Sequence, residues 1–521
     1  MLQERSVKAD PPIYRAESPR AERSLLADVG LLVLLAVALL LFHQLTNHRY
    51  GFHRDELGML DDARYLDWGY VSYPPLTPLI ARAAMEWFGT SLVAIRFFSA
   101  LAQSVAMVLT GLMARELGGG RWAQVVAAVA MAAAPISMLM GAMFQYVSFD
   151  YLWWVLTAYF LIRLLKSDNP RWWLAIGATL GVGMMTKYTM AFFVVGIVGG
   201  VLLTPARRYL RSPWLWAGAG LSLLIFLPNL LWQIQHDFIS LDFLNSIHAR
   251  DVRIGRTSGY LPEQLYVTTS TLTIPLWVTG LIYYFFLPEG KRYRLLGWAY
   301  LITFLLLLVM QGRSYYLAAA YPMLLAAGAV VWERWLAARP ASQARWARTV
   351  IGVALGISLL SSVLLMTPVA PVNSALWEVI NSIHDNFREQ IGWPELVETV
   401  AQIYNELPEE ERVKTAILTG NYGEAGAINL YGPDYGLPTA ISGVNSFWLR
   451  GYGDPPPTQV IVLGYSQEEA EQFFTTCIHA GRATNRYNVA NEETAENPDI
   501  WLCREPRLPW PELWPQLQHF G

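Results

Sequence analysis

The chain has 521 residues, of which 54% are hydrophobic and only 15% are charged, and its mean hydropathy is positive at +0.29. Soluble domains carry about 25% charged residues, so this composition excludes an ordinary soluble domain and indicates an integral membrane protein. The formal net charge is −3 and no large basic face is evident, which argues against nucleic acid as a partner.

The apolar residues fall in runs long enough to cross about 30 Å of hydrocarbon as helices. The chain is therefore predicted to be mainly α, with a polytopic transmembrane helical bundle of about eleven spans over residues 25–367. In the stretch 172–204, Lys187 favours two short spans over one long helix, because two spans place this cation at an interface. The expected spans lie near residues 25–45, 92–113, 122–142, 149–165, 172–186, 189–204, 214–232, 269–287, 295–310, 315–332 and 349–367.

Basic residues concentrate in alternate connections between these spans, such as those with Arg121 and Arg345. By the positive-inside rule these connections and the tail 1–24 belong in the cytoplasm. The external loop 46–91, the 233–268 connection and the chain after 367 then face outward. We expect a multi-pass protein of the cell (inner) membrane, with its first span retained as an anchor because that span is too long for a signal peptide.

The last part of the chain, 368–521, is predicted to be a small extracytoplasmic α/β domain. Residues 412–418 and 458–463 are typical of buried strands, and 395–406 and 467–474 are typical of helices. The turn 420–426 follows a strand and invites comparison with a phosphate-binding loop. Its glycine spacing does not fit, and Glu424 would repel an anion, so a structural turn is favoured.

Only two cysteines occur, Cys477 and Cys503, and both lie in this outer domain. In an oxidising compartment they can pair, whereas free buried thiols would behave as small apolar residues. The sequence leaves both alternatives open because spacing does not report geometry.

An acidic pair, Asp55-Glu56, follows the first span within a short and strongly charged stretch. Charge near hydrocarbon is costly, so a polar cluster at the mouth of a span is typical of a functional site, although a solvated loop is the alternative. The charged residues are Arg54, Asp55, Glu56, Asp61, Asp62 and Arg64.

The segments 50–56 (YGFHRDE), 66–71 (LDWGYV) and 74–76 (PPL) resemble the first external loop of the protein O-mannosyltransferase-like superfamily. These are GT-C membrane glycosyltransferases, among them bacterial aminoarabinose transferases and lipopolysaccharide core transferases. Asp150 and the segment 186–188 (TKY) match further. The resemblance implies transfer of a sugar, a hexose or pentose, from a polyprenyl-phosphate donor on the outer face of the membrane.

Such a transfer needs a base near the acceptor hydroxyl and cations near the leaving phosphate. By resemblance, Asp55 is the general base and Glu56 orients the acceptor or a neighbouring group. Asp150, near the start of its span, either faces the same cavity or is simply a favourable acid at a helix N-terminus. We expect these three carboxylates to form the catalytic set.

The expected substrate-binding residues are mostly cations of the outer face. Lys187 meets either the lipid phosphate or membrane headgroups, and the basic 233–268 loop is favoured for a phosphate role over generic headgroup attraction. Tyr73 stands where many relatives have His or Lys, which removes one phosphate-binding cation. The full expected set is Arg54, Tyr73, Lys187, His236, Arg250, Arg253, Arg256 and Arg313.

No His, Cys or Asp spacing signals a dedicated metal site, and no Walker loop predicts ATP. Outer carboxylates can hold a divalent ion, but the expected chemistry requires no cofactor. The expected partners are the polyprenyl-phosphate sugar, a lipid, cell-envelope glycan or protein acceptor, and membrane lipids. The rival class is a transporter or flippase of a lipid-linked saccharide, which is disfavoured because no inverted repeat is evident and the ionisable residues gather at one face.

Overall fold

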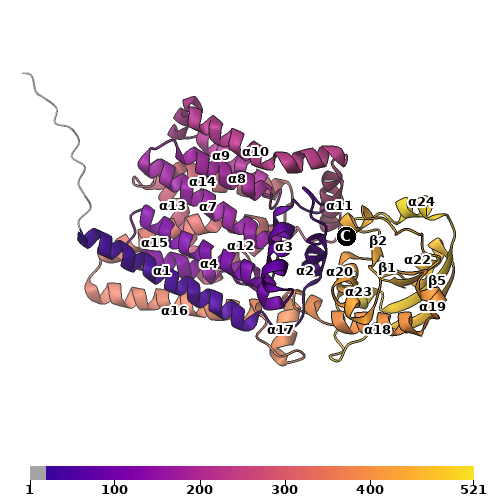
Figure 1. Ribbon diagram of the computed structural model, residues 1–521. Helices are drawn as coiled ribbons and strands as arrows, with labels where there is room; N and C mark the ends of the chain where they lie inside the picture. The colour runs from indigo at the N-terminus through magenta and orange to yellow at the C-terminus, as the bar shows by residue number, and fades with distance from the viewer. Residues whose placement is uncertain (1–18) are drawn as a thin grey trace, which may run out of the picture.

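The computed structural model describes residues 19–521 and has two parts, a long helical bundle and a small mixed domain at one end of it (Figure 1). The predicted tail, 1–24, falls largely outside the described residues, and the first helix, α1, already begins at Pro19. The predicted fold class, a membrane helical bundle with a C-terminal α/β domain, is confirmed.

Every expected span coincides with helical structure. Among residues 19–521, seven helices are long and apolar enough to cross a membrane, and there are up to ten spans if each of three bent helix pairs is one span. The remaining expected span, 172–186, is the shorter apolar helix α8. The bundle contains α1 (Pro19–Thr46), α4 (Leu92–Glu116), α5 (Arg121–Ala132), α6 (Pro135–Ala142), α7 (Tyr146–Ser167), α8 (Trp172–Met184), α9 (Met190–Leu202), η1 (Pro205–Arg211), α10 (Pro213–Gln235), α12 (Tyr260–Tyr266), η2 (Thr271–Thr273), α13 (Ile274–Phe286), η3 (Lys291–Tyr293), α14 (Arg294–Val309), η4 (Ser314–Ala320), α15 (Tyr321–Ala337) and α16 (Ala341–Met366).

The core of the bundle lies around α4, α5, α7 and α15, where small residues allow helices to pack closely. In the apolar stretch of the span that contains α15, 83% of the residues are buried, whereas the corresponding share is only 11% in α10 and in α16. The outer helices expose large apolar side chains such as Leu223 and Leu360, which suits contact with hydrocarbon.

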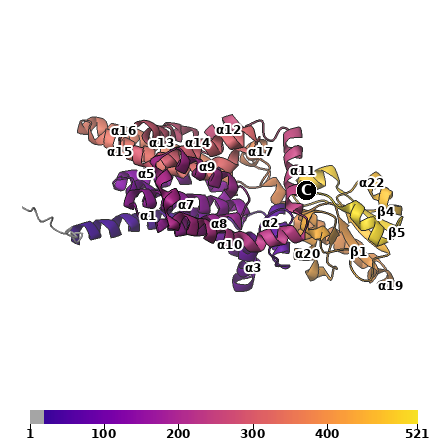
Figure 2. The ribbon, with the colours of Figure 1, turned by 90° about the horizontal axis from the view of Figure 1, so that it is seen from above.

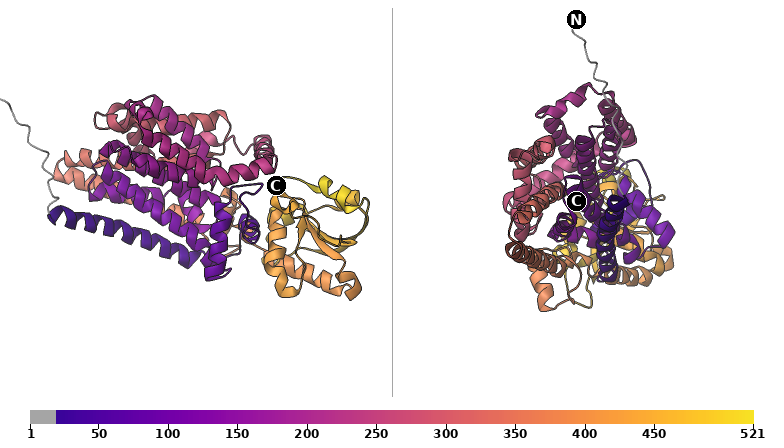
Figure 3. Two further views of the ribbon diagram at one scale, coloured as in Figure 1. Left: turned by 45° about the horizontal axis from the view of Figure 1, so that its top comes forward. Right: turned by 90° about the vertical axis from the view of Figure 1, so that its left-hand side faces the viewer.

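The basic connections gather at the end of the bundle far from the C-terminal domain. Arg121 pairs there with Asp28 at 2.7 Å, and Lys166 pairs with Glu116 at 2.9 Å. The opposite end carries the loop 47–91 and the C-terminal domain (Figure 3). Alternate connections therefore lie at opposite ends, which matches the arrangement that the basic residues predict.

Several short helices fill the space between the bundle and the C-terminal domain (Figure 2). The expected external loop forms α2 (Arg54–Asp62) and α3 (Leu76–Phe88), and the 233–268 connection forms α11 (Ile239–Arg253). The chain after residue 367 forms α17 (Ala375–Ile383).

The C-terminal domain is built on a five-stranded sheet with the order β2-β1-β3-β5-β4. β1 pairs in parallel with β2 and β3, and β5 pairs antiparallel with β3 and β4. Both expected strands, 412–418 and 458–463, are present as β1 and β3. The strands are β1 (Thr415–Thr419), β2 (Ile441–Ser442), β3 (Gln459–Leu463), β4 (Phe474–Arg482) and β5 (Asp499–Pro506).

Helices cover this sheet, and the expected helices 395–406 and 467–474 correspond to α18 and α22. Cys477 on β4 lies directly opposite Cys503 on β5, and the two form a disulfide. Of the two alternatives for the cysteines, the structure has the paired form. The remaining elements are η5 (Arg388–Gln390), α18 (Trp393–Glu406), α19 (Glu409–Arg412), α20 (Tyr422–Tyr431), η6 (Gly432–Tyr435), α21 (Asn445–Trp448), α22 (Gln467–Phe473), α23 (Glu492–Glu496), α24 (Trp510–Leu513) and η7 (Trp514–Leu517).

Candidate active site

Helix α2 begins with a capping box that fixes the acidic pair. The His53 side chain accepts a hydrogen bond from the Asp55 amide at 3.1 Å, and the Glu56 carboxylate accepts one from the His53 amide at 2.8 Å. Both acids then lie in the first turn, where the helix dipole favours negative charge. The sequence thus defines the position at which α2 starts.

A cavity of about 490 Å³ lies between the bundle and the C-terminal domain. α2, α11 and the start of α7 contribute to its wall, together with the segment around Lys187 and residues of the C-terminal domain. The cavity brings together many of the expected site residues. Its charged lining residues other than histidine are Arg54, Asp55, Asp62, Lys187, Arg250, Asp251, Arg256 and Arg313.

Asp55 lies on this wall with its side chain 31% exposed. One carboxylate oxygen accepts a hydrogen bond from the Tyr422 hydroxyl at 2.8 Å, and the other accepts one from the side-chain amide of Gln145 at 2.9 Å. Burial raises the pKa of Asp55, but the neighbouring His53 and Arg54 side chains and the Tyr422 hydroxyl outweigh it and hold the pKa below its ordinary value. Asp55 is therefore ionised at neutral pH.

Lys187 lies in the short segment between α8 and α9, as expected, and lines the same cavity. Its ammonium group lies over three tyrosine rings, at 4.0 Å from the centroid of Tyr316, 5.1 Å from Tyr146 and 5.2 Å from Tyr315. The nitrogen has no hydrogen-bond partner among residues 19–521. Lys187 is only 8% exposed, so its side chain lies in the cavity wall and not on the outer surface of the bundle.

The other expected cations divide into two groups. Arg250 and Arg256 line the cavity, and Arg313 lines it while it pairs with Asp251 at 2.6 and 2.9 Å. Arg253 is exposed at the end of α11, away from the cavity wall. His236 stacks on Trp232 with ring centroids 4.0 Å apart, so its ring is occupied elsewhere.

Arg54 and Tyr73 also line the cavity but already have partners. Arg54 pairs with Glu492 at 2.8 Å and Glu493 at 2.9 Å, and the Tyr73 hydroxyl donates to Asp62 at 2.6 Å. Burial raises the pKa of Asp62 to about 6, against the opposing charge of Arg450, which bridges Asp62 and Asp61. Tyr73 thus contributes a hydrogen-bonded wall of the cavity and no positive charge.

Glu56 does not face the cavity. It is fully buried and pairs with Arg96 of α4, with atom separations of 2.8 and 2.6 Å, and it accepts a hydrogen bond from the Phe144 amide at 2.7 Å. A guanidinium inside the bundle needs a counter-ion, and Glu56 supplies it. Of the two alternatives for Glu56, the contacts agree with the orienting of a neighbouring group, because Glu56 fixes the start of α2, which carries Asp55.

Asp150 does not line the cavity but contacts a residue that does. It accepts hydrogen bonds from the Thr189 hydroxyl at 2.8 Å and the Trp154 indole at 3.0 Å, and Thr189 itself lines the cavity. The Asp150 carboxylate itself is not among the groups that line the cavity. Its partners lie on α7 and in the segment between α8 and α9, so it ties α7 to the segment that carries Lys187.

Comparison with known proteins finds similarity between this chain and glycosyltransferases. The family model described as dolichyl-phosphate-mannose-protein mannosyltransferase matches residues 72–232. The lipid A galacturonosyltransferase RgtD of Rhizobium johnstonii is 28% identical over 214 residues. That match covers 40% of this chain, which spans only 44% of the length of this curated relative.

Two solved structures match most of the chain. ArnT from Cupriavidus metallidurans bound to undecaprenyl phosphate is 15% identical with a TM-score of 0.57, and covers 92% of this chain and 98% of its own. The apo form is 14% identical with a TM-score of 0.58 and the same coverage. The chain has the GT-C fold of the ArnT type. The resemblance found in the first external loop is confirmed at the level of the fold.

Three residues that contact the acids of α2 are absent from the sequence prediction: Gln145, Tyr422 and Arg450. Tyr422 belongs to the C-terminal domain and lies 367 residues from Asp55 along the chain. In the sequence it belongs to the turn 420–426, for which only a structural role is expected. Among residues 19–521, no group of three or more His, Cys, Asp or Glu side chains is arranged to hold a metal ion.

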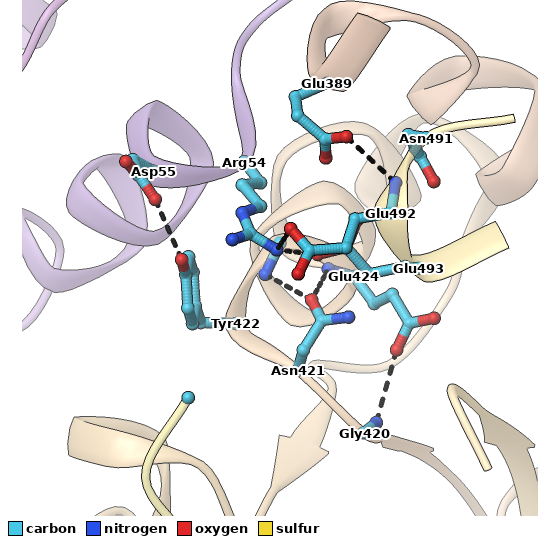
Figure 4. A network of polar contacts seen from close by, with 12 residues as sticks. Arg54, Asp55, Glu389, Gly420, Asn421, Tyr422, Glu424, Asn491, Glu492 and Glu493 are labelled. Carbon is cyan, nitrogen blue, oxygen red and sulfur yellow. Dashed lines mark hydrogen bonds and ion pairs between the residues drawn. The ribbon is translucent and has the colours of Figure 1, made fainter. Parts of the chain in front are cut away.

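Behind the candidate site, Arg54 lies close to Glu389, Glu492 and Glu493, while the Glu424 carboxylate accepts a hydrogen bond from the Gly420 amide at 3.2 Å (Figure 4). Glu492 and Glu493 pair with Arg54 directly, and Glu389 accepts a hydrogen bond from the Glu492 amide at 2.9 Å. Burial, reinforced by the negative charge of Glu493, raises the pKa of Glu424 to about 8. The C-terminal domain therefore encloses a protonated glutamate at neutral pH.

This protonation predicts a pH-dependent stability. The pKa of Glu424 rises from 4.5 to about 8 on folding. The folded state thus holds the Glu424 proton more tightly than the unfolded state does. The contribution of this proton to the free energy of unfolding is complete below pH 4.5 and is lost as pH rises through 8. We expect Glu424→Gln to weaken this loss by up to about 1.4 kcal/mol per pH unit in that window. Melting temperatures in detergent from pH 5 to 9 measure it, with the exposed Glu468→Gln as control; equal slopes in all three proteins would contradict it.

Proposed function

We propose that this protein is an integral membrane glycosyltransferase that moves a sugar, a hexose or pentose, from a polyprenyl-phosphate donor to a hydroxyl of a lipid or cell-envelope glycan. The observation that carries the proposal is the cavity, where an ionised carboxylate and an unpaired buried ammonium line one space. Names of relatives support it, because RgtD acts on lipid A and the ArnT structure holds undecaprenyl phosphate. A lipid A-like acceptor is therefore favoured over protein.

In the proposed reaction the acceptor oxygen attacks the anomeric carbon of the donor sugar. The new bond joins this oxygen to the anomeric carbon, and the bond from that carbon to the phosphate oxygen breaks. The acceptor proton passes to Asp55, and the polyprenyl phosphate leaves with the bonding electron pair. Asp55 suits this role because it is ionised and partly accessible from the cavity.

The leaving phosphate needs positive charge that is free to respond to it. Arg54 and Arg313 are already paired with carboxylates. Lys187 has no hydrogen-bond partner among the described residues, and the same holds for Nε of Arg250. We therefore assign the phosphate first to Lys187, with Arg250 and Arg256 beside it on the cavity wall.

The test is a transfer assay with the purified protein. Labelled polyprenyl phosphates carrying galacturonate, aminoarabinose or mannose are mixed with lipid A, and the products are separated by thin-layer chromatography. Label that moves to the lipid A fraction supports the proposal and identifies the sugar. Label that crosses a vesicle membrane while it stays on its polyprenyl phosphate would instead support a flippase.

Lys187→Met should weaken binding of polyprenyl phosphate by about 10–100-fold, because one charge-assisted contact to phosphate is lost. Titration calorimetry with polyprenyl phosphate alone measures this without any sugar. Lys166→Met is the matched control, because Lys166 is exposed and pairs with Glu116 at the far end of the bundle. Unchanged affinity in a folded Lys187→Met protein would contradict the assignment.

We also propose that the cavity end faces outward and the basic end faces the cytoplasm. Reporter fusions should then give outside signals at Gly423 and Pro455 and inside signals at Arg121 and Arg345. A cytoplasmic signal from the C-terminal domain would reverse the orientation and remove the proposed acceptors from reach.

A further inference from the structure

Helix α20 of the C-terminal domain packs against α2 with almost no space between the backbones. A Cβ atom on Gly426 would lie 2.6 Å from the Leu57 carbonyl carbon. A Cβ atom on Gly58 would lie 3.0 Å from the Tyr422 ring. Gly423 and Gly426 of the 420–426 segment therefore serve a close helix contact, which explains a motif that resembles a phosphate loop only superficially.

This contact determines where the Tyr422 side chain lies. Asn421 caps α20 and accepts hydrogen bonds from the Gly423 amide at 2.7 Å and the Glu424 amide at 3.0 Å, so Tyr422 is the first residue of the helix. The Arg54 guanidinium lies 5.7 Å from the centroid of the Tyr422 ring. The hydroxyl of Tyr422 points at the Asp55 carboxylate (Figure 4).

We propose that Tyr422 is a positioning residue through which the C-terminal domain holds the Asp55 carboxylate in its reactive orientation. This inference rests on the proposed function. Tyr422 holds one carboxylate oxygen and Gln145 the other. An ionised carboxylate offers about four lone-pair sites, so two donors fix its plane and still leave sites for the acceptor proton.

The hydroxyl of Tyr422 is suited to permanent donation. Burial, together with the negative charge of Asp55, raises the pKa of Tyr422 well above its ordinary value, so the hydroxyl keeps its proton. A donor to the ionised form stabilises it. The other charged and titratable groups that act on Asp55 are His53 at the N-cap of α2, Arg54 of α2, Tyr146 of α7 and Arg313 across the cavity. All of them remain when only the hydroxyl is removed.

Tyr422→Phe tests this inference through the pH dependence of the transfer rate. Loss of one hydrogen bond to a carboxylate should lower kcat by about 10–100-fold at pH 7 and move the acid limb of the profile to higher pH. Tyr404→Phe is the matched control, because its hydroxyl donates to the Arg412 carbonyl at 3.0 Å in the same domain. That variant should keep the wild-type profile.

The result separates this inference from the proposed function. Wild-type protein without any transfer activity would overturn the function. Active wild type, with a Tyr422→Phe protein of normal kcat and unshifted acid limb, would overturn the positioning role alone.

If Tyr422→Phe does not fold, Gly58→Ala decides, because the added methyl displaces the ring with the hydroxyl retained and should shift the same limb. In an Asp55→Asn background, Tyr422→Phe should cause no further loss.

Discussion

The Asp55→Asn protein should lose about 10²–10⁴-fold in transfer rate while its melting temperature stays close to that of the wild type. The amide has nearly the same shape as the carboxylate but does not accept the proton of the acceptor hydroxyl. The side chain is 31% exposed at a cavity wall, so the change buries no new unsatisfied charge. Initial rates with the donor identified by the transfer assay measure the effect.

Asp434→Asn is a matched control for this experiment, because it makes the same chemical change at an exposed carboxylate of the C-terminal domain. Its rate should equal that of the wild type. A stable Asp55→Asn protein with near-normal transfer would show that proton removal occurs elsewhere, and the proposed chemistry at α2 would fail with it.

The second large effect is expected on stability. Arg96→Met leaves Glu56 buried without its counter-ion, and breaking a buried pair in this way costs about 3–5 kcal/mol. Both partners are completely buried, and the pair joins α4 of the bundle to the start of α2. We expect a marked fall in the melting temperature in detergent, accompanied by loss of activity because α2 carries Asp55.

Two further variants make this prediction specific. Glu56→Gln combined with Arg96→Met should recover part of the loss, because no uncompensated charge remains. Arg82→Met removes an exposed pair with Glu86, whose side chains are 39% and 55% exposed, and should cost at most about 1 kcal/mol. Equal melting temperatures for Arg96→Met and Arg82→Met would contradict a structural role for the buried pair.

The sequence predicts the spans well because the hydrocarbon imposes a local rule on each of them. A run of about twenty apolar residues has few alternatives to a helix, and a cation such as Lys187 marks the interruption between two shorter ones. The buried strands β1 and β3 are also apolar runs and are found. β4 is missed because its residues, including Thr475 and His479, are largely exposed and form no such run.

The site is predicted less completely, for geometric reasons. Asp55 and Glu56 are neighbours in sequence, but successive side chains of a helix point about 100° apart, so adjacency does not tell which acid faces a cavity. The partner of Glu56 is 40 residues away, and that of Asp55 is 367 residues away. The contact between Glu56 and Arg96 forms only when α2 packs on α4, and the contact between Asp55 and Tyr422 forms only when the C-terminal domain docks on the loop. No local pattern reports either pairing.

The close contact between α2 and α20 also defines the unit that related proteins can exchange. A tail grafted from a relative would meet Leu57 and Gly58 with whatever residues stand at positions 423 and 426, and any side chain larger than glycine at Gly426 would collide with the backbone of α2. A working chimera would therefore carry the segment 54–62 together with its own tail. Although some 300 residues of membrane bundle separate these two pieces in sequence, they would be inherited as one module.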